Sequence, residues 1–404
     1  MKSPKHILVI CSWSRVNPLV HRYVLPYLAI VQRHLGPDST IHLMTYEQTP
    51  ELGEITAQPS DASWQSLNVR WVPQPYSPLR IRGWWLYIRQ IFAVRRYCRQ
   101  NRITTLHAFA PVAGAVAWLS SRLSSRKLII DSWEPHAECM VETGVWSRSS
   151  LSFRLLWWME KKMAHDADIL IAAHPEMIRY AEEKWQFSPA QVRYRPACVN
   201  LEEFNPARFD RTALRKKFSL AHDAIVCVCA SQLGGMYYLD ESLMLFDHGR
   251  RHWGDRFVVQ LLTTTPKETI LERANALRLN IDHVHIHCCA PEDVPEHLAL
   301  ADFAYNPQKA VASKRYGTPV KNGEYWAMGL PIAMMKETSQ DSTLAIAHQA
   351  GVVLEDMSIA SMSWLMEQLE LLLNDSGCRE RCRSVAQQTR SFAIAEEAYR
   401  SIYG

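Results

Sequence analysis

The sequence predicts an α/β protein of two domains, each built on a parallel β-sheet. Short apolar runs that suit buried strands alternate with segments of helical periodicity, which is typical of parallel sheets covered by helices. The alternation occurs twice, before and after a turn-rich connection at residues 195–206. The length of 404 residues agrees with this division, because it suffices for two or three domains that each bury a core.

The first alternation covers residues 1–200, which we expect to form an N-terminal domain. A run such as His6–Cys11 is short and apolar, as a buried strand should be. Further strands are expected at 41–46, 69–72, 104–109, 127–131 and 168–172, and helices at 19–35, 83–99, 112–123, 151–163 and 175–185.

The second alternation covers residues 201–383, which we expect to form a C-terminal domain. Its predicted strands, with helices between them, lie at 225–230, 257–262, 284–287, 303–306, 332–335 and 352–354. We expect residues 384–404 to form a terminal helix that crosses back to the first domain.

The stretch 313–331 is the most informative part of the sequence. A turn at Gly317–Pro319 precedes a predicted helix at 320–328. Lys321 lies in the first turn, where helix energetics alone favour an acid, so its charge indicates a bound anion. Glu324 lies on the same side of the helix and can accept hydrogen bonds from sugar hydroxyls. The alternative is an ordinary loop–helix–strand packing unit.

This stretch resembles the donor-site motif of the retaining family-4 glycosyltransferases, which have the GT-B fold of two Rossmann-like domains facing a central cleft. The matching residues are Pro319, Lys321, Glu324, Tyr325, Ala327, Gly329 and Pro331. The connection at 195–206 is similar to the family's interdomain segment. Tyr316 departs from the pattern, because many members carry a second Glu there, near the transferred sugar. The resemblance implies a hexosyltransferase that moves a sugar from a nucleotide-diphosphate donor to a glycan or lipid-linked acceptor, as in polysaccharide biosynthesis.

The resemblance places the nucleotide-sugar donor in the second domain. In the family the helix terminus holds the diphosphate and the Glu that matches Glu324 binds the ribose, so Lys321 and Glu324 are expected in the catalytic site. Gly234 and Gly235 can bring backbone amides close to phosphates, although a packing turn is an equal alternative. The expected donor-binding residues are Gly234, Gly235, Tyr237, Tyr316, Thr318, Val320, Lys321, Asn322 and Glu324.

The loop after the strand at 127–131 carries the acceptor-side candidates. The family frequently has a His or Asp on this loop near the sugar, and His136 is the residue we expect to be catalytic; a merely solvated histidine is the alternative. The other candidates are Asp131, Glu134, Glu138 and His107. The resemblance implies a front-face mechanism in which the donor phosphate accepts the acceptor proton, so that Lys321 and the helix terminus stabilise the leaving diphosphate.

The positive charge is concentrated in the first half of the chain. Residues 1–200 hold 24 Lys and Arg against 15 Asp and Glu, and no acid lies between Asp61 and Asp131, where eleven Lys and Arg occur. On a helix at 83–99, one side mixes aromatic residues with arginines, which suits an anionic lipid surface, while a second side can pack on the sheet. The first side consists of Trp85, Arg89, Phe92, Arg96 and Arg99, and the second of Leu86, Ala93, Val94 and Tyr97. A solvated helix face is the alternative.

Cysteine usage and spacing argue against a metal or disulfide protein. The ten cysteines form no Cys-x-x-Cys pair, so we expect reduced thiols and a cytoplasmic protein. The basic side of the helix at 83–99 adds the expectation that this protein is peripheral at the inner face of the membrane. No apolar run reaches the roughly 18 residues of a membrane span. We expect no metal and no cofactor besides the nucleotide sugar, because three candidate groups lack zinc-site or nucleotide-metal context: His283/His285/His287/Cys289, Cys378/Cys382 and Asp166/Asp168.

Two other functions remain open from the sequence. A sugar-binding GT-B pseudoenzyme is suggested by Tyr316 and by the lack of the Arg and Lys that relatives carry after the first strand of the second domain. A basic nucleic-acid-binding protein would explain residues 62–130, but their aromatic residues lie on a predicted helix rather than on a strand-borne stacking platform. We therefore expect no nucleic-acid partner.

Overall fold

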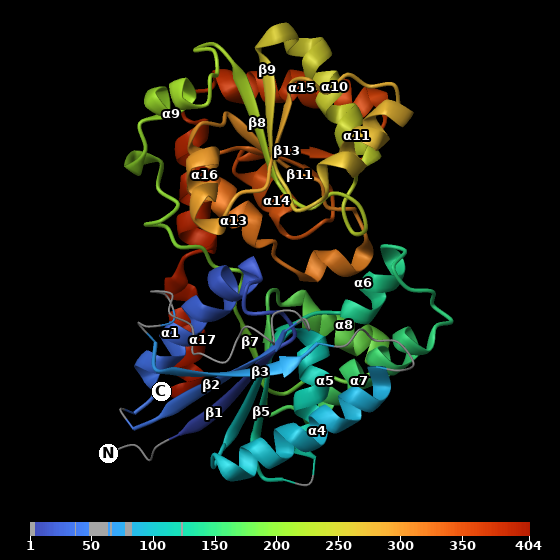
Figure 1. Cartoon of the computed structure of the whole chain (residues 1–404), viewed down its shortest axis with the longest axis vertical. Coiled ribbons are helices and arrows are strands. Elements are labelled where there is room, and N and C mark those ends of the chain that lie inside the picture. The colour runs from blue at the N-terminus through green and yellow to red at the C-terminus, as the bar shows by residue number, and fades with distance from the viewer. Residues whose placement is uncertain (1–4, 37, 48–63, 65–66, 77–82, 123) are drawn as a thin grey trace. The chain divides into compact units, whose positions relative to one another are not determined.

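The chain consists of two compact units. The computed structural model describes residues 5–36, 38–47, 64, 67–76, 83–122 and 124–404. Unit 1 comprises Met1–Val141, Trp146–Pro196 and Ala393–Gly404, and unit 2 comprises Glu142–Val145 and Ala197–Phe392. The colours of Figure 1 follow the chain from blue to red, so the red helix among the blue strands marks its return to unit 1.

Unit 1 is built on a seven-stranded parallel sheet in the order β3-β2-β1-β4-β5-β6-β7. Its strands are β1 His6–Cys11, β2 Thr40–Glu47, β3 Val69–Pro75, β4 Thr105–Phe109, β5 Lys127–Trp133, β6 Ile169–Ala172 and β7 Val192–Tyr194. Its helices are α1 Leu25–His34, preceded by a π-helical turn at Val20–Val24, α4 Gly83–Gln100, α5 Ala110–Ser121, α6 His136–Glu142, α7 Leu151–Asp166, α8 Glu176–Trp185 and α17 Phe392–Tyr403.

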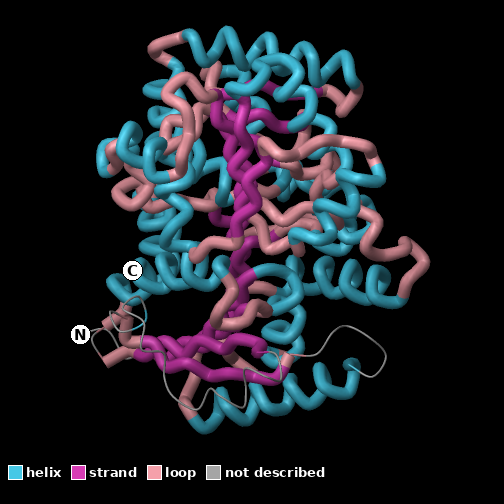
Figure 2. Tube along the Cα trace, turned by 45° about the horizontal axis from the view of Figure 1, so that its top comes forward, coloured by secondary structure: helices cyan, strands magenta, loops and turns pink. Residues whose placement is uncertain are grey.

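Unit 2 is built on a six-stranded parallel sheet in the order β10-β9-β8-β11-β12-β13, the doubly wound arrangement of a Rossmann-like domain. Its strands are β8 Ile225–Ala230, β9 Phe257–Leu262, β10 Val284–His287, β11 Phe303–Asn306, β12 Ile332–Met335 and β13 Gly351–Leu354. Its α-helices are α9 Arg211–Lys217, α10 Asp240–Trp253, α11 Lys267–Ala276, α12 Val294–Ala299, α13 Val320–Ala327, α14 Asp341–Ala347, α15 Ile359–Asn374 and α16 Cys378–Thr389. Figure 2 shows the strands of each unit gathered in a layer with helices beside it.

Burial on both faces explains why the unit 2 strands are continuous apolar runs. Successive side chains of a strand point to opposite faces. In β8, Val226 and Val228 join a core cluster with α13 and α16, whereas Cys227 and Cys229 join a second cluster with α10 and α15. Each face of the sheet therefore needs its own apolar side chains, which removes the polar alternation of a half-exposed strand.

The α/β fold with two parallel sheets is confirmed, and most expected elements lie within two or three residues of their observed bounds. The sequence interpretation missed β7, a three-residue edge strand with no buried residue. It also ended β5 too early, because the strand continues past a register shift between Ile130 and Trp133, where Ser132 has a φ of 54°.

The unit boundaries differ slightly from the expected ones. The chain leaves unit 1 between Pro196 and Ala197 rather than after residue 200, and it returns at Ala393 rather than at residue 384. The return is later because α16 packs against α13 and contributes Cys378, Cys382, Val385 and Ala386 to the core of unit 2. Only α17 joins unit 1.

Candidate functional site

The carboxyl ends of β8 and β11 gather the donor-side segments of unit 2. Strand order reverses between these two strands, and open α/β sheets bind ligands outside the carboxyl ends at such a point. Two backbone contacts join the segments that follow them: Tyr237 forms a bridge with Gln308, and the Tyr238 amide donates to the Pro307 carbonyl at 2.8 Å.

Lys321 connects the start of α13 to the loop after β8. Its Nζ donates to Ser231 Oγ at 2.8 Å and lies 4.6 Å from the centroid of the Tyr237 ring. No ion pair involves Lys321 among the residues that the structure describes, and α13 begins without a side-chain cap or an acid in its first turn. The helix terminus therefore keeps its partial positive charge, and Lys321 adds a full charge that no carboxylate of the described residues neutralises.

Gly234 and Gly235 adopt backbone conformations that side chains rarely allow. Their φ angles are 91° and 61°, and a Cβ added to either would meet no atom within 4 Å. Leu233, just before them, is held in place because its amide donates to Thr265 Oγ1 at 2.9 Å and its carbonyl accepts from the same hydroxyl at 3.1 Å. The loop is therefore anchored at one side and open above the glycines, as an approach to a ligand would require.

Glu324 lies one turn after Lys321 and is only 6% exposed. The next residue, Tyr325, is fully buried, and its hydroxyl accepts a hydrogen bond from the Ala230 amide at 2.9 Å. This contact fixes α13 to the end of β8. Glu324 thus stands on a helix that the sheet positions, although its expected contact with ribose stays a prediction.

The Asn322 side chain cannot bind the donor in this structure, contrary to the sequence interpretation. It is fully buried, donates to Asp341 Oδ2 at 2.8 Å and accepts from Asn306 Nδ2 at 2.9 Å. Asp341 is also paired with the buried Arg390. These polar groups satisfy one another in the core, so only the Asn322 backbone amide remains a candidate. Asp341 and Arg390 carried no motif that could have revealed them.

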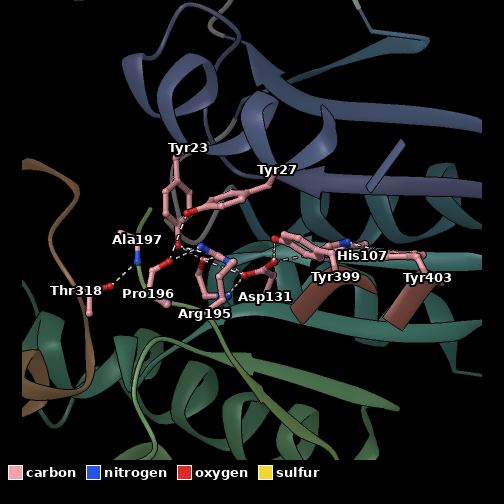
Figure 3. A network of polar contacts seen from close by, with 11 residues as sticks. Tyr23, Tyr27, His107, Asp131, Arg195, Pro196, Ala197, Thr318, Tyr399 and Tyr403 are labelled. Carbon is pink, nitrogen blue, oxygen red and sulfur yellow. Dashed lines mark hydrogen bonds and ion pairs between the residues drawn. The ribbon is translucent and has the colours of Figure 1, made fainter. Parts of the chain in front are cut away.

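Three other residues that were expected to bind the donor differ in their contacts and exposure. Thr318 Oγ1 accepts a hydrogen bond from the Ala197 amide at 2.7 Å, which fastens the start of the 197–392 segment to the turn before α13 (Figure 3). Val320, the first residue of α13, can offer its backbone amide. Tyr316 is 7% exposed and lies under the Arg315 guanidinium at 5.1 Å.

In unit 1, Asp131 and His107 belong to a buried polar network that is closed to solvent (Figure 3). Both side chains are 0% exposed. Asp131 is paired with Arg195, lies 3.2 Å from His107 Nε2 and accepts from the Tyr399 hydroxyl at 2.5 Å. Both residues were expected on the acceptor side, but they hold α17 against the sheet instead. No local sequence pattern indicated the contact with Tyr399, which lies far along the chain on α17.

The charge of Asp131 is stabilised by its neighbours. Burial by itself would raise the pKa of the Asp131 carboxyl, but the Arg195 guanidinium and hydrogen bonds from His107 and Tyr399 hold it well below its usual value. Arg195 also stacks on the Tyr27 ring, 3.9 Å from the centroid. The carboxylate is therefore a fixed structural charge.

His136, in contrast, is partly exposed, and its expected role stays a prediction. It begins α6, and its Nδ1 lies 3.4 Å from Glu134 Oε1, with the two side chains 25% and 30% exposed. Within the described residues, Nε2 has no hydrogen-bond partner. Glu134 can therefore hold the Nδ1 proton and leave Nε2 directed to a substrate, a common arrangement of functional histidines. Glu138, another candidate for contact with the acceptor, is buried and interacts with the Tyr180 hydroxyl instead.

The described residues contain no group of three or more His, Cys, Asp or Glu side chains that could hold a metal ion. His285 and His287 instead form hydrogen bonds with the Gln260 side chain, at 3.1 and 2.8 Å. Asp166 accepts from Trp118 and Arg122, and Asp168 from the Leu128 amide. These acids and histidines have structural partners.

The basic helix α4 presents the expected residues to solvent where its side chains are described. Arg89, Phe92, Arg96 and Arg99 are exposed, with Phe92 at 63%, whereas the side chain of Trp85 lies outside the described residues, as does that of Leu86. The packing side includes Gln90, Val94 and Cys98. It also includes the expected Tyr97, whose hydroxyl lies 2.8 Å from His42 Nδ1 of β2. Ala93 was assigned to this side wrongly and is exposed. No helix of the described chain is both long and apolar enough to cross a membrane.

The comparisons with known proteins agree with this fold. Residues 28–198 match the family model described as a glycosyl transferase 4-like domain. No curated protein sequence matches the chain. Among solved structures, sucrose-phosphate synthase from Thermosynechococcus elongatus is similar at 14% identity with a TM-score of 0.77, over 99% of both chains. WaaG, a glycosyltransferase involved in lipopolysaccharide biosynthesis, is similar at 14% identity and 0.73, over 98% of this chain and 100% of its own.

HepE from Anabaena, solved in complex with UDP-glucose, is similar at 11% identity with a TM-score of 0.66, over 98% of both chains. Identities this low show a shared fold. The chain therefore contains a glycosyl transferase 4-like domain at residues 28–198 and has the GT-B fold of the glycosyltransferases that it matches. The resemblance to the family-4 glycosyltransferases, inferred from the motif at 319–331, is confirmed by the domain matched at residues 28–198.

Proposed function

We propose that this glycosyltransferase is a retaining enzyme that moves a sugar from a nucleotide-diphosphate donor to a glycan or lipid-linked acceptor. The observation that carries the proposal is the environment of Lys321. Its ammonium group has no carboxylate partner in the described chain, and it joins the uncapped start of α13 to the loop of Gly234 and Gly235. Such a concentration of positive potential at the reversal point of a doubly wound sheet suits a diphosphate.

The donor would be held by groups of three kinds. The first-turn amides of α13 and the amides of Gly234 and Gly235 would meet the phosphate oxygens, and Lys321 would neutralise part of their charge. Glu324 would accept from the ribose hydroxyls, and Tyr237 would stack on the base. Because HepE is solved with UDP and with UDP-glucose, uridine diphosphate is the first nucleotide to test.

The reaction would proceed on one face of the sugar. The bond from the anomeric carbon to the diphosphate oxygen breaks, the acceptor oxygen bonds to the same carbon on the same side, and the acceptor proton passes to the departing diphosphate. No protein base is required. Negative charge grows on the leaving group, so Lys321 and the start of α13 would stabilise the transition state more than the bound donor. His136 would contact the transferred sugar through Nε2.

A lipid-linked acceptor would fit an apolar cavity next to the exposed arginines of α4. Helices α4, α5 and α7 line a cavity of about 100 Å³ with residues that include Ile88, Ile91, Val112, Val116, Leu155 and Met159. Beside it, Ile88 and Phe92 are 43% and 63% exposed, together with Arg89 and Arg96. Apolar side chains among arginines favour an anionic lipid surface, where the enzyme would reach such acceptors.

Two measurements test the proposal. Thermal unfolding with a panel of nucleotide diphosphates should reveal one binder, because a ligand at 100 times its Kd stabilises by about 2.7 kcal/mol. NMR of the product anomer, or of the sugar released by donor hydrolysis, should show retained configuration. Binding without transfer or hydrolysis would favour the pseudoenzyme that Tyr316 suggests. A product with inverted anomeric configuration would contradict the retaining mechanism.

A further inference from the structure

Helix α7 contains one carboxyl group in the interior of unit 1, that of Glu160. The side chain is 0% exposed, and no Lys, Arg or His pairs with it among the described residues. Oε1 accepts from the Ala137 amide at 2.9 Å, and Oε2 has no hydrogen-bond partner in the part of the chain described. Acids are seldom buried completely without a cation, so a specific use of this one is expected.

The hydrogen bond of Glu160 fixes the beginning of α6. That helix starts at His136 and follows Pro135, and the first amides of a helix need acceptors from outside it. Glu160 supplies one of them from another helix, and it also interacts with the His136 amide. The backbone that carries the imidazole is thus attached to the core of unit 1 at its first turn.

The surroundings of Glu160 favour its neutral form. Burial, first, and then the nearby carboxyls of Glu134 and Glu138 raise the pKa of Glu160 well above its usual value, while the amides of Ala137 and His136 lower it. The Tyr180 hydroxyl of α8 also lies near Glu138 and Glu160. A neutral carboxyl accepts from Ala137 as an amide would, which makes glutamine a close substitute.

We propose that Glu160 is the positioning residue of His136: it fixes the first turn of α6, and through that turn the direction in which Nε2 meets the substrate. Glu134 holds the other ring nitrogen, at 3.4 Å. Glu134 therefore constrains the ring of His136, and Glu160 constrains the backbone that carries it. The inference rests on the proposed role of His136 at the transferred sugar.

Replacing Glu160 with Gln or Leu separates the hydrogen bond from the charge. E160Q keeps an acceptor for the Ala137 amide and should retain kcat within about twofold near pH 7. E160L removes the acceptor and should lower kcat at least tenfold, while the affinity for the nucleotide diphosphate in unit 2 stays unchanged. E182Q, an exposed carboxyl on α8, is the matched control and should behave as the wild type.

The pH profile and a double-mutant cycle decide between positioning and mere support of the fold. Ionisation would place an unpaired charge in the core beside Glu134 and Glu138 and disturb the first turn of α6. The wild type should therefore lose kcat on the alkaline side as the buried carboxyl ionises, and E160Q should lack that loss. E160L should lower kcat in the wild type but hardly further in H136A, because residues that act through one another are not additive.

Equal losses in both backgrounds, or a wild-type alkaline loss that persists in E160Q, would overturn the inference. If H136A itself keeps full turnover, the proposed role of His136 fails, and a remaining effect of E160L would then belong to folding. If E160L does not fold, the pH profiles of E160Q and the wild type still decide the question.

Discussion

Lys321 Nζ lies 2.8 Å from Ser231 Oγ, and this contact joins the first turn of α13 to the loop that follows β8. The two residues are far apart in sequence, and only the parallel sheet brings them together. A diphosphate at this point would exchange a neutral hydroxyl partner of the lysine for charged oxygens. The contact thus holds the lysine at the position where we propose that the donor binds.

Lys321→Ala should weaken nucleotide-diphosphate binding roughly ten- to hundredfold, because a charge-assisted hydrogen bond contributes about 1.5–3 kcal/mol. Glu324→Gln should weaken it less, since the amide still accepts one hydrogen bond from a hydroxyl. Isothermal titration measures both. Lys336→Ala is the control, because that lysine pairs with Glu355 at the surface. Unchanged affinity in both variants, with unfolding as in the wild type, would contradict the donor assignment.

His136→Ala should lower turnover while the nucleotide diphosphate alone binds almost normally. The imidazole lies on unit 1, and its Nε2 has no partner in the described chain, whereas the proposed nucleotide-binding groups lie on unit 2. Turnover with the full donor and acceptor, compared with titration of the nucleotide alone, separates the two effects. His165→Ala, an exposed histidine at the end of α7, serves as control. An equal loss of nucleotide affinity would argue that the loop is structural.

The sequence predicted the fold better than the site, for a physical reason. Buried strands such as β8 and β9 need apolar side chains on both faces, so each appears in the sequence as a run of consecutive apolar residues. Their bounds were therefore predicted to the residue. Whether a polar residue faces solvent or the core depends on partners elsewhere in the chain. Asp131 meets Tyr399 and Asn322 meets Asp341, contacts that no local pattern reveals.

Asp131→Asn should lower the free energy of unfolding by about 3–5 kcal/mol, because it leaves Arg195 buried without its counter-charge. The pKa of Asp131 is depressed in the folded state. Its contribution is therefore complete above the unfolded pKa of about 3.9 and is lost as pH falls through the lower folded value. Urea unfolding at pH 7 and pH 3 should show the difference between variant and wild type shrinking in acid.

Glu396→Gln is the control for that measurement, because Glu396 forms a partly exposed pair with Arg33 and should cost less than about 1 kcal/mol. A loss of turnover in Asp131→Asn without a loss of stability would restore the acceptor-side role that the buried network excludes.

The last prediction is that α4 docks unit 1 on anionic membranes. Each Arg near an anionic leaflet contributes on the order of 1 kcal/mol, so Arg89, Arg96 and Arg99 together favour binding by several kcal/mol before Phe92 inserts. Salt should weaken the binding, because the Debye length falls to about 3 Å at 1 M. Co-sedimentation with anionic vesicles at low salt should retain the wild type and release the Arg89/Arg96/Arg99→Glu variant. An Arg208/Lys216/Lys217→Glu variant makes the same change of charge on exposed residues of unit 2 and should stay bound. If the wild type remains in the supernatant, or if both variants are released equally, the basic face of α4 is not a membrane site.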